Sequence, residues 1–380
     1  MKKMGSKMLV SAVFCLGLFP LTDSFTPVHS RAMAFYGTMA ASLSQAPSAW
    51  YSSPEIQRDR SHVVGDMLPN LYKDSTRFVF MTNYGVLHQS PQIAPAYLTI
   101  SEITEFLVNR EPSTSLEQIV DGTDEATLLA WVGKVNDHDY WVLQQADFEG
   151  EPASFENASM SPLREFGDRL TSEIDAGILA TANGLVEFHK SHKFCSYCGS
   201  RTVPQKAGAC RRCVNCERSV YPRLDIATIM LITSSCGQYA LLGRKRQWPK
   251  GRYSTLAGFA EVGETLEECC IRETFEESGV SVDPSTVGFV ASQPWPFPRS
   301  VMVGFQGSAI KNGDDGKLPK INVDVNEMED IQWFAKDYVK QRLSGGSTAL
   351  GFKPNKSEAE FHIPGKSSLA RLLITSWTDS

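Results

Sequence analysis

The chain is 380 residues long, which is long for one domain and suits two compact domains with extensions. Hydrophobic residues make up 42% of the composition and charged residues 21%, as in ordinary globular proteins. The net charge of −6 excludes a generally basic surface of the kind that coats nucleic acid, although it leaves room for a local basic groove.

Residues 1–54 have the composition of a targeting presequence. Three lysines precede an apolar run from Met8 to Leu21 that is too short for a comfortable membrane span, as in a secretory signal. The segment from Ser24 to Pro54 contains no acidic residue and is rich in Ser and Ala, as transit peptides are. With Phe25 near the junction, the leader resembles the bipartite presequences of algae with secondary plastids.

We therefore predict import into an organelle, with the plastid first and the mitochondrion or peroxisome as alternatives. A later start at Met33 or Met39 is a further alternative. The C-terminal Thr378-Asp379-Ser380 is not a peroxisomal signal of the Ser-Lys-Leu type.

Residues 55–190 alternate strand-like and helical stretches and predict an N-terminal α+β domain. Segments 77–81 and 126–132 are rich in aromatic and branched residues. Segment 135–142 comes next, and its Asn136-Asp137 region makes a plausible hairpin turn. Asp175 is expected to open a helix with apolar residues at helical spacing. These residues favour a packing or dimerisation domain over a catalytic one.

Residues 191–222 contain two CxxC pairs, Cys195 with Cys198 and Cys213 with Cys216, separated by fourteen residues. Each pair places two sulfurs on one tight turn, and two such turns supply the four thiolates that a structural zinc prefers. Four protein ligands leave no open coordination position, so this single zinc is predicted to be structural. Cys210 is interpreted as a bystander because the later pair keeps the ribbon spacing.

The segment from Leu266 to Ser278 is predicted to be a helix, since Thr265 and Glu268 form a capping box and Gly279 is a natural stop. Projected at 3.6 residues per turn, Glu273, Glu276 and Glu277 fall on the same side as the apolar residues. Three buried carboxylates would repel one another, and hard divalent cations are the usual remedy. Glu267 and Glu268 are expected to form a solvated face.

The same stretch resembles the Nudix box, from Gly258 through Glu264 to Arg272-Glu273-Thr274-Phe275-Glu276-Glu277-Ser278-Gly279-Val280. Thr274 departs from the aliphatic residue of the pattern, which affects packing rather than chemistry. The resemblance implies an α/β class protein, with a Nudix α/β/α sandwich over residues 223–380 preceded by the four-Cys ribbon and the α+β domain.

A second motif narrows the range of possible substrates. Ser292-Gln-Pro-Trp-Pro-Phe-Pro-Arg-Ser300 has three alternating prolines that we expect to hold an extended backbone, with Trp295 and Phe297 free to stack on a base. The stretch resembles the signature of the NADH pyrophosphatase subfamily, whose members also carry the ribbon and a Tyr-Pro pair after it, here Tyr221-Pro222. The resemblance covers Asp175 to about Trp377.

The resemblance implies two sets of functional residues. The metal set, for two or three Mg²⁺ or Mn²⁺ ions, is the Ala257 carbonyl with Glu273, Glu276, Glu277 and Glu327. The substrate set is Tyr221, Gln293, Pro294, Trp295, Pro296, Phe297, Pro298, Arg299, Ser300 and Ala370, with Arg169 as a weak match and Arg164 as its rival. An acidic residue that the subfamily often has after the second Cys is replaced by Gly208.

These residues predict hydrolysis of the pyrophosphate bond of NAD(H) to NMN(H) and AMP by metal-activated water, with Arg272 orienting the glutamates. Glu277 and an acid of a flexible loop are both candidates for the general base. The rivals are removal of NAD caps from RNA along a basic track near Lys245, hydrolysis of ADP-ribose or diadenosine polyphosphates, and an inactive nucleotide- or RNA-binding protein. The resemblance also implies a homodimer, and no association with a membrane is expected.

Overall fold

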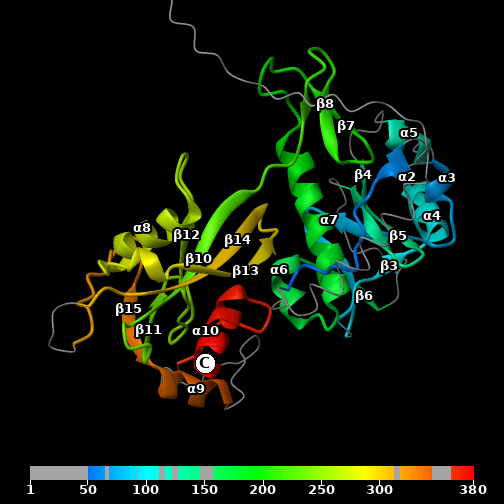
Figure 1. Ribbon diagram of the computed structural model, residues 1–380. Helices are drawn as coiled ribbons and strands as arrows, with labels where there is room; N and C mark the ends of the chain where they lie inside the picture. The colour runs from blue at the N-terminus through cyan, green and yellow to red at the C-terminus, as the bar shows by residue number, and fades with distance from the viewer. Residues whose placement is uncertain are drawn as a thin grey trace, which may run out of the picture.

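The computed structural model describes residues 50–64, 68–91, 93–110, 116–121, 127–145, 157–311, 317–344 and 361–380. They form an N-terminal domain, a zinc ribbon and a C-terminal α/β domain in chain order (Figure 1). Within these residues no helix is both long and apolar enough to cross a membrane. The predicted mixed α/β class is confirmed.

The N-terminal domain is built on a sheet of six strands in the order β4-β5-β1-β2-β6, with β3 paired to β1. The β1–β5 pair is parallel and the other pairs are antiparallel. The strands are β1 Thr76–Thr82, β2 Gly85–Gln89, β3 Tyr97–Leu98, β4 Thr127–Val135, β5 His138–Gln145 and β6 Ala158–Ser161. The helices are α2 Ser61–Val64, α3 Leu68–Leu71, α4 Ile100–Arg110, α5 Leu116–Asp121, α6 Leu163–Phe166, η1 Gly167–Arg169 and α7 Glu173–Ser191.

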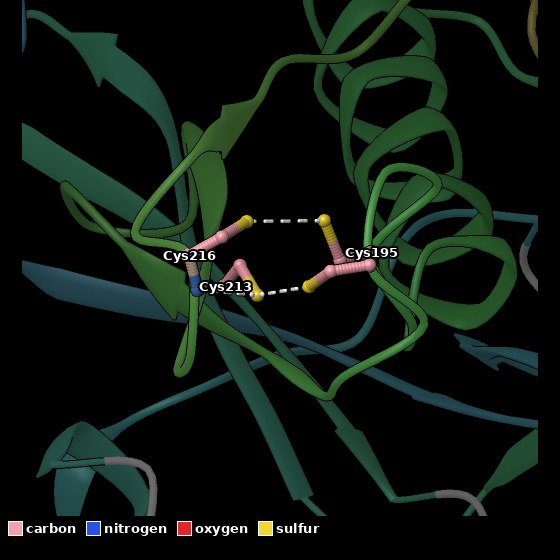
Figure 2. Close-up of side chains that lie close together, drawn as sticks. Cys195, Cys213 and Cys216 are labelled. Carbon is pink, nitrogen blue, oxygen red and sulfur yellow. Dashed lines mark hydrogen bonds between the residues drawn. The ribbon is translucent and has the colours of Figure 1, made fainter.

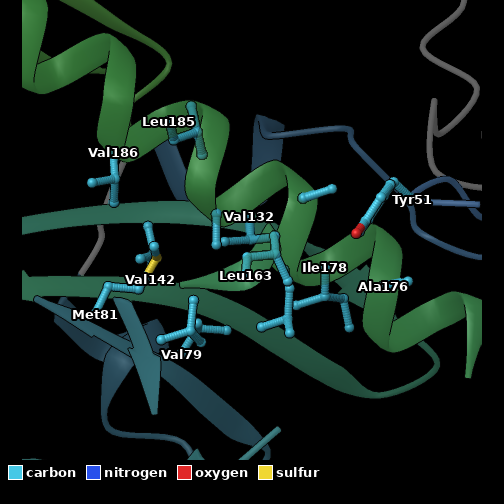
Figure 3. Close-up of a cluster of buried hydrophobic side chains, with 14 of the residues drawn as sticks. Tyr51, Val79, Met81, Val132, Val142, Leu163, Ala176, Ile178, Leu185 and Val186 are labelled. Atoms are coloured by element: carbon cyan, nitrogen blue, oxygen red, sulfur yellow. The ribbon is translucent and has the colours of Figure 1, made fainter. Parts of the chain in front are cut away.

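The helix α7 covers one face of this sheet, and Figure 3 shows its buried residues against those of the strands. Ser172, not Asp175, caps it, because the Ser172 hydroxyl accepts a hydrogen bond from the Asp175 backbone N–H. The predicted hairpin is present: β4 and β5 pair around Asn136, whose φ of 52° is the left-handed conformation such turns require. Ala126, the first residue of the predicted strand, lies outside the described residues.

The described part of the chain begins within the predicted presequence. Residues 1–49 lie outside the described part, but residues 50–54 are built into the fold. Tyr51 and Ser53 are each only 3% exposed, and the Trp50 indole donates a hydrogen bond to the Gly167 carbonyl. This packing joins the start of the described chain to the α6–α7 region, so residues 50–54 belong to the folded protein.

The ribbon is a three-stranded antiparallel sheet in the order β7-β8-β9 (Thr202–Gln205, Cys210–Cys213 and Ser219–Val220). Its β7–β8 turn docks on the N-terminal domain, where the Trp131 backbone N–H donates to the Ala207 carbonyl. Gly208 has φ 78°, and a Cβ there would lie 2.3 Å from Ala130. This close approach leaves no room for a side chain at position 208.

The C-terminal domain is a sheet in the order β13-β14-β10-β11-β15, with β12 paired to β10 and a parallel β10–β14 pair. Its strands are β10 Asp225–Thr233, β11 Tyr239–Arg244, β12 Leu256–Phe259, β13 Gly288–Trp295, β14 Ser300–Ser308 and β15 Asp330–Ala335. Its helices are α8 Leu266–Ser278, η2 Pro284–Thr286, α9 Lys336–Ser344 and α10 Leu369–Asp379.

Successive side chains of β10 point to opposite faces of the sheet, and each face has its own hydrophobic core. Met230 and Ile232 pack with the α8 residue Cys270, whereas Ile229 and Leu231 pack with residues of α9 and α10. Helices therefore cover both faces, as predicted for an α/β/α sandwich. The 223–380 boundary of this domain remains a prediction.

Candidate active site

The four predicted zinc ligands converge at the end of the ribbon. The Sγ atoms of Cys195 and Cys216 lie 3.7 Å apart, those of Cys198 and Cys213 lie 3.5 Å apart, and all four lie within 4.8 Å of one another (Figure 2). Tetrahedral zinc with Zn–S bonds of about 2.3 Å requires sulfurs about 3.8 Å apart, so these thiols fit that ion. Cys210 is buried outside the cluster, as expected for a bystander.

The predicted carboxylate helix is α8, with the expected capping box at Thr265 and a left-handed Gly279 at its end. Its three glutamates differ in exposure. The side chains of Glu273 and Glu276 are 14% and 56% exposed, and residue Glu277 is 2% exposed. The expectation that Glu276 faces inward is wrong. Glu276 lies at the margin of the apolar stripe, and a hydrogen bond from the Arg272 guanidinium, one turn earlier, holds its side chain at the surface.

Arg272 is the centre of the box. Its guanidinium donates two hydrogen bonds to Glu264, at 2.7 and 2.8 Å, and one each to Glu273 and Glu276, both at 2.9 Å. These bonds to Arg272 lower the pKa of the Glu264 carboxyl to about 2. Arg272 therefore orients the acidic side chains, as the sequence predicts, and Glu264 anchors Arg272.

Glu277 lies in the least solvated part of the box. Its pKa is raised to about 8, mainly by burial and also by nearby Glu273 and Glu327, while Lys245 and the Ala257 backbone N–H act in the opposite direction. One of its carboxylate oxygens is buried without a hydrogen-bond partner within the described chain. A buried oxygen of this kind is an available ligand for a hard cation.

Two neighbouring elements complete this acidic corner. A Cβ at Gly258 would meet the Glu273 carboxylate at 1.8 Å, so only glycine lets that side chain lie against β12. The loop before β15 covers the end of α8, with the Asp324 N–H donating to the Glu277 carbonyl, and it carries the exposed Glu327. Ala257 and Glu327 thus both lie near Glu277.

The sheet register places the Nudix loop and the second motif around the same strand end. Near the start of β10, Ala227 pairs with Phe259 at the end of β12, and Asp225 pairs with Ser300 at the start of β14. Tyr221 lies four residues before β10 and is half exposed. A hollow beside this strand end is lined by Leu224, Asp225, Ile226, Phe259, Ala260, Glu261, Val262, Glu264 and Leu266.

The proline-rich motif is not extended throughout. The extended strand β13 ends at Trp295, which pairs with Ser300, and the four residues between them form a hairpin turn. Trp295 and Phe297 meet edge to face at 5.2 Å rather than lying side by side. Pro296 is buried and its carbonyl accepts a hydrogen bond from Asn183, so the turn packs on α7.

Of the two candidate arginines, the structure brings Arg164 to the aromatic turn. Its guanidinium carbon lies 5.9 Å from the Trp295 ring centroid and 6.0 Å from that of Phe297. Arg169 is exposed on η1. Arg164 belongs to the N-terminal domain and reaches the turn through tertiary packing. Its position in the sequence does not reveal this contact.

Gln293 and Ala370 lie on the α10 face of the sheet, opposite α8. The Gln293 side chain accepts from the Leu369 N–H and donates to the Ser367 and Trp50 carbonyls. A pocket with Gln293, Trp50, Ser368 and Arg371 in its wall opens beside the start of α10. Ala370 itself is buried in the core.

Comparison with protein families gives the class of protein. The NUDIX domain model matches residues 223–350, and the NADH pyrophosphatase zinc ribbon domain model matches residues 190–221. The chain therefore contains a Nudix domain. More narrowly, it joins the Nudix domain to the zinc ribbon of the NADH pyrophosphatases.

Three curated relatives illustrate the likeness. NAD-capped RNA hydrolase NUDT12 of Homo sapiens is 30% identical over 328 residues, covering 81% of this chain and 66% of that protein. The NAD-capped RNA hydrolase of Schizosaccharomyces pombe is 38% identical, covering 55% and 57%. Nudix hydrolase 19, chloroplastic, of Arabidopsis thaliana is 34% identical, covering 54% and 52%. The chain spans just under two thirds of the human relative and less of the other two.

Proposed function

We propose that this protein hydrolyses the pyrophosphate bond of NAD(H), giving AMP and NMN(H), with the help of divalent cations. The observation that carries the proposal is the buried, unpartnered oxygen of Glu277 beside Glu273 at the end of β12. Relatives named as NAD-capped RNA hydrolases, together with the ribbon match, support a nicotinamide dinucleotide as the substrate.

In this proposal Glu273, Glu277 and Glu327 hold Mg²⁺ or Mn²⁺, with Glu276 and the Ala257 carbonyl as further ligands. When bound, the cations neutralise charge developing on the pyrophosphate and activate water. Arg272 keeps Glu273 in place through the 2.9 Å hydrogen bond. Glu277 is our candidate for the general base, because one of its carboxylate oxygens is buried without a hydrogen-bond partner beside the proposed cations.

The substrate set is proposed to bind the dinucleotide around the aromatic turn. Trp295 and Phe297 present flat rings, and Arg164 adds a cation above them. Tyr221 and Arg299 lie at the same strand end, and Gln293 shapes the adjoining α10 pocket. The same set is compatible with the NAD cap of an RNA, so removal of that cap is a second proposed activity.

The proposal is tested by incubating the purified, zinc-loaded protein with NADH, NAD, ADP-ribose and NAD-capped RNA under Mg²⁺ and Mn²⁺. Product analysis should show AMP and NMN(H) from the dinucleotides and a 5′-monophosphate end on the RNA. Glu267→Gln, on the exposed side of the same helix, should retain activity, whereas Glu277→Gln should lose it. Hydrolysis of ADP-ribose alone, or of none of the four, would overturn the proposal.

We also propose that two copies assemble as a homodimer. Leu224, Ile226, Phe259 and Val262 line the hollow at the β10 start and are 43% to 106% exposed, which is costly for a monomer in water. Light scattering should give twice the chain mass for the wild type and a monomer for Val262→Glu. A wild-type monomer with full activity would contradict this proposal.

The leader is proposed to direct the protein to the plastid and to be removed before Trp50. The acid-free composition supports import, one relative is named as chloroplastic, and the packing of Tyr51 supports the limit on cleavage. Sequencing the N-terminus of the mature protein should find a start at or before Trp50. A mature form starting after Ile56 would contradict the limit.

A further inference from the structure

The tip of the zinc ribbon displays aromatic side chains to solvent. Phe194 and Tyr197, which flank and occupy the first knuckle, are 66% and 67% exposed, and Val214 in the second knuckle is 62% exposed. Phe194 forms a β-bridge with Arg201, and the Val214 N–H donates a hydrogen bond to the Arg201 carbonyl. Neither ring belongs to a hydrophobic core, so their exposure needs another explanation.

Cations are interleaved with these rings. The Arg218 guanidinium carbon lies 3.6 Å from the Tyr197 ring centroid, which is a stacked arrangement that leaves the other face of the ring open. Residues 190–223 contain eight Lys and Arg residues and one acidic residue, Glu217, whereas the whole chain carries a net charge of −6. The ribbon is therefore a basic module on an acidic protein, even after two charges are subtracted for a zinc with four thiolates.

The positive surface continues from the tip towards the aromatic turn. Strand β9 runs from the knuckle that holds Arg218 to Tyr221, whose hydroxyl lies 3.2 Å from the Lys206 ammonium. Two residues further on, the Arg223 carbonyl accepts a 3.4 Å hydrogen bond from the Arg299 guanidinium, at the turn that carries Phe297. Ribbon tip, β9 and turn thus form one cationic path.

We propose that this path, from Phe194 and Tyr197 along β9 to Arg299, binds a single-stranded RNA whose 5′ end occupies the active site. The inference rests on the proposed removal of NAD caps. Open aromatic rings beside cations are the combination that binds single strands, since unpaired bases stack on the rings and phosphates meet the cations. A duplex hides its base faces and cannot use the rings.

The test compares Phe194→Ala/Tyr197→Ala and Arg218→Glu with the wild type, with Tyr84→Ala, an exposed tyrosine of the N-terminal domain, as the matched control. Fluorescence anisotropy measures binding of an uncapped 5′-monophosphate RNA 12-mer over a range of salt concentrations. We expect roughly tenfold weaker binding for each ribbon variant. The slope of log affinity against log salt should fall by about 0.7 for each phosphate that the Arg218→Glu variant no longer neutralises.

Kinetics with two substrates separate this surface from the active site. The kcat/KM for NAD-capped RNA should fall about as much as RNA affinity, while kcat/KM for free NADH and the zinc content stay at the wild-type level. Equal binding by wild type and ribbon variants, or tighter binding of duplex than of single strand, would overturn the inference. A protein that binds single strands through the ribbon but hydrolyses no dinucleotide would overturn the proposed function and leave this surface standing.

Discussion

In the zinc ribbon the four thiols lie within 4.8 Å of one another, whereas the carboxylates of the Nudix box are spread around Arg272. Among the residues that the structure describes, only the four cysteines converge closely enough for one ion. The difference follows from how the groups are held. The thiols are fixed by two short turns, whereas the ionised carboxylates stand on longer side chains, repel one another and need a counter-cation. In the box, Arg272 meets part of that need and a divalent cation would meet the rest.

The largest effect is expected from disrupting the zinc site. Cys198→Ser removes one of four zinc ligands, and the binding free energy of a structural zinc is on the order of 10 kcal/mol. We expect zinc content below one per chain and loss of the ribbon fold, measured by metal analysis and hydrogen exchange. Cys210→Ser, outside the cluster, should retain one zinc. Full zinc occupancy in the Cys198 variant would contradict the four-ligand assignment.

The corresponding change in the Nudix box removes Arg272, the cation that balances part of the carboxylate charge. Arg272→Ala frees Glu273 and Glu276 and removes the partner of Glu264, so the carboxylates should separate. Loss of a group that orients metal ligands costs about 10- to 100-fold in metal affinity or activity. Calorimetric Mn²⁺ titration should show this loss, with partial recovery in Arg272→Lys. Unchanged Mn²⁺ affinity in Arg272→Ala would show that the box is as rigid as the ribbon.

A pH dependence is expected where the ribbon meets α7. The His189 Nε2 lies 2.9 Å from the Gly208 carbonyl, and its Nδ1 lies 2.9 Å from the Arg211 guanidinium, so the neutral ring donates through Nε2. Burial, assisted by Arg211, His192 and Arg60, lowers its pKa to about 4.

In the unfolded chain, where the histidine pKa is about 6.5, His189 therefore binds a proton at a pH at which it stays neutral in the folded chain. Stability should fall as pH drops from about 6.5 towards 4, by about 2 kcal/mol at pH 5. Chemical denaturation of wild type and His189→Gln at pH 7.5 and 5 measures the effect, because acid loss of zinc is common to both. Equal losses in the two proteins would contradict it.

The smallest effect concerns the departure from the Nudix pattern. Thr274 is fully buried, and its hydroxyl donates to the Cys270 carbonyl one turn earlier. Thr274→Val restores an aliphatic side chain of similar shape, and we expect a stability change within about 1 kcal/mol with unchanged kcat/KM. A tenfold change in kcat/KM would show that this position takes part in the chemistry.

Features set by neighbouring residues were predictable from the sequence. The two knuckles, the capping box at Thr265 and the stop at Gly279 all depend on a few consecutive residues, and the structure confirms them. The burial of Glu277 also followed from helical spacing.

Features set by distant packing were not predictable. Glu276 is exposed at the helix margin, where its side chain accepts a hydrogen bond from Arg272. Arg164 reaches the aromatic turn from another domain, and residues 50–54 are held by α6 and α7 despite a transit-like composition. Pro296 and Phe297 lie in a turn because β13 and β14 pair up to Trp295 and Ser300.

The central claim is that Glu277 completes a divalent cation site, and the stabilisation of the protein by Mg²⁺ or Mn²⁺ tests it most directly. At a hundred times its dissociation constant, the cation should stabilise the wild type by about 2.7 kcal/mol, seen as a rise in melting temperature. Glu277→Gln keeps the size of the neutral carboxyl, so it should fold about as well without metal and lose most of that rise, while the exposed Glu267→Gln keeps it. An equal rise in Glu277→Gln and wild type would contradict the account.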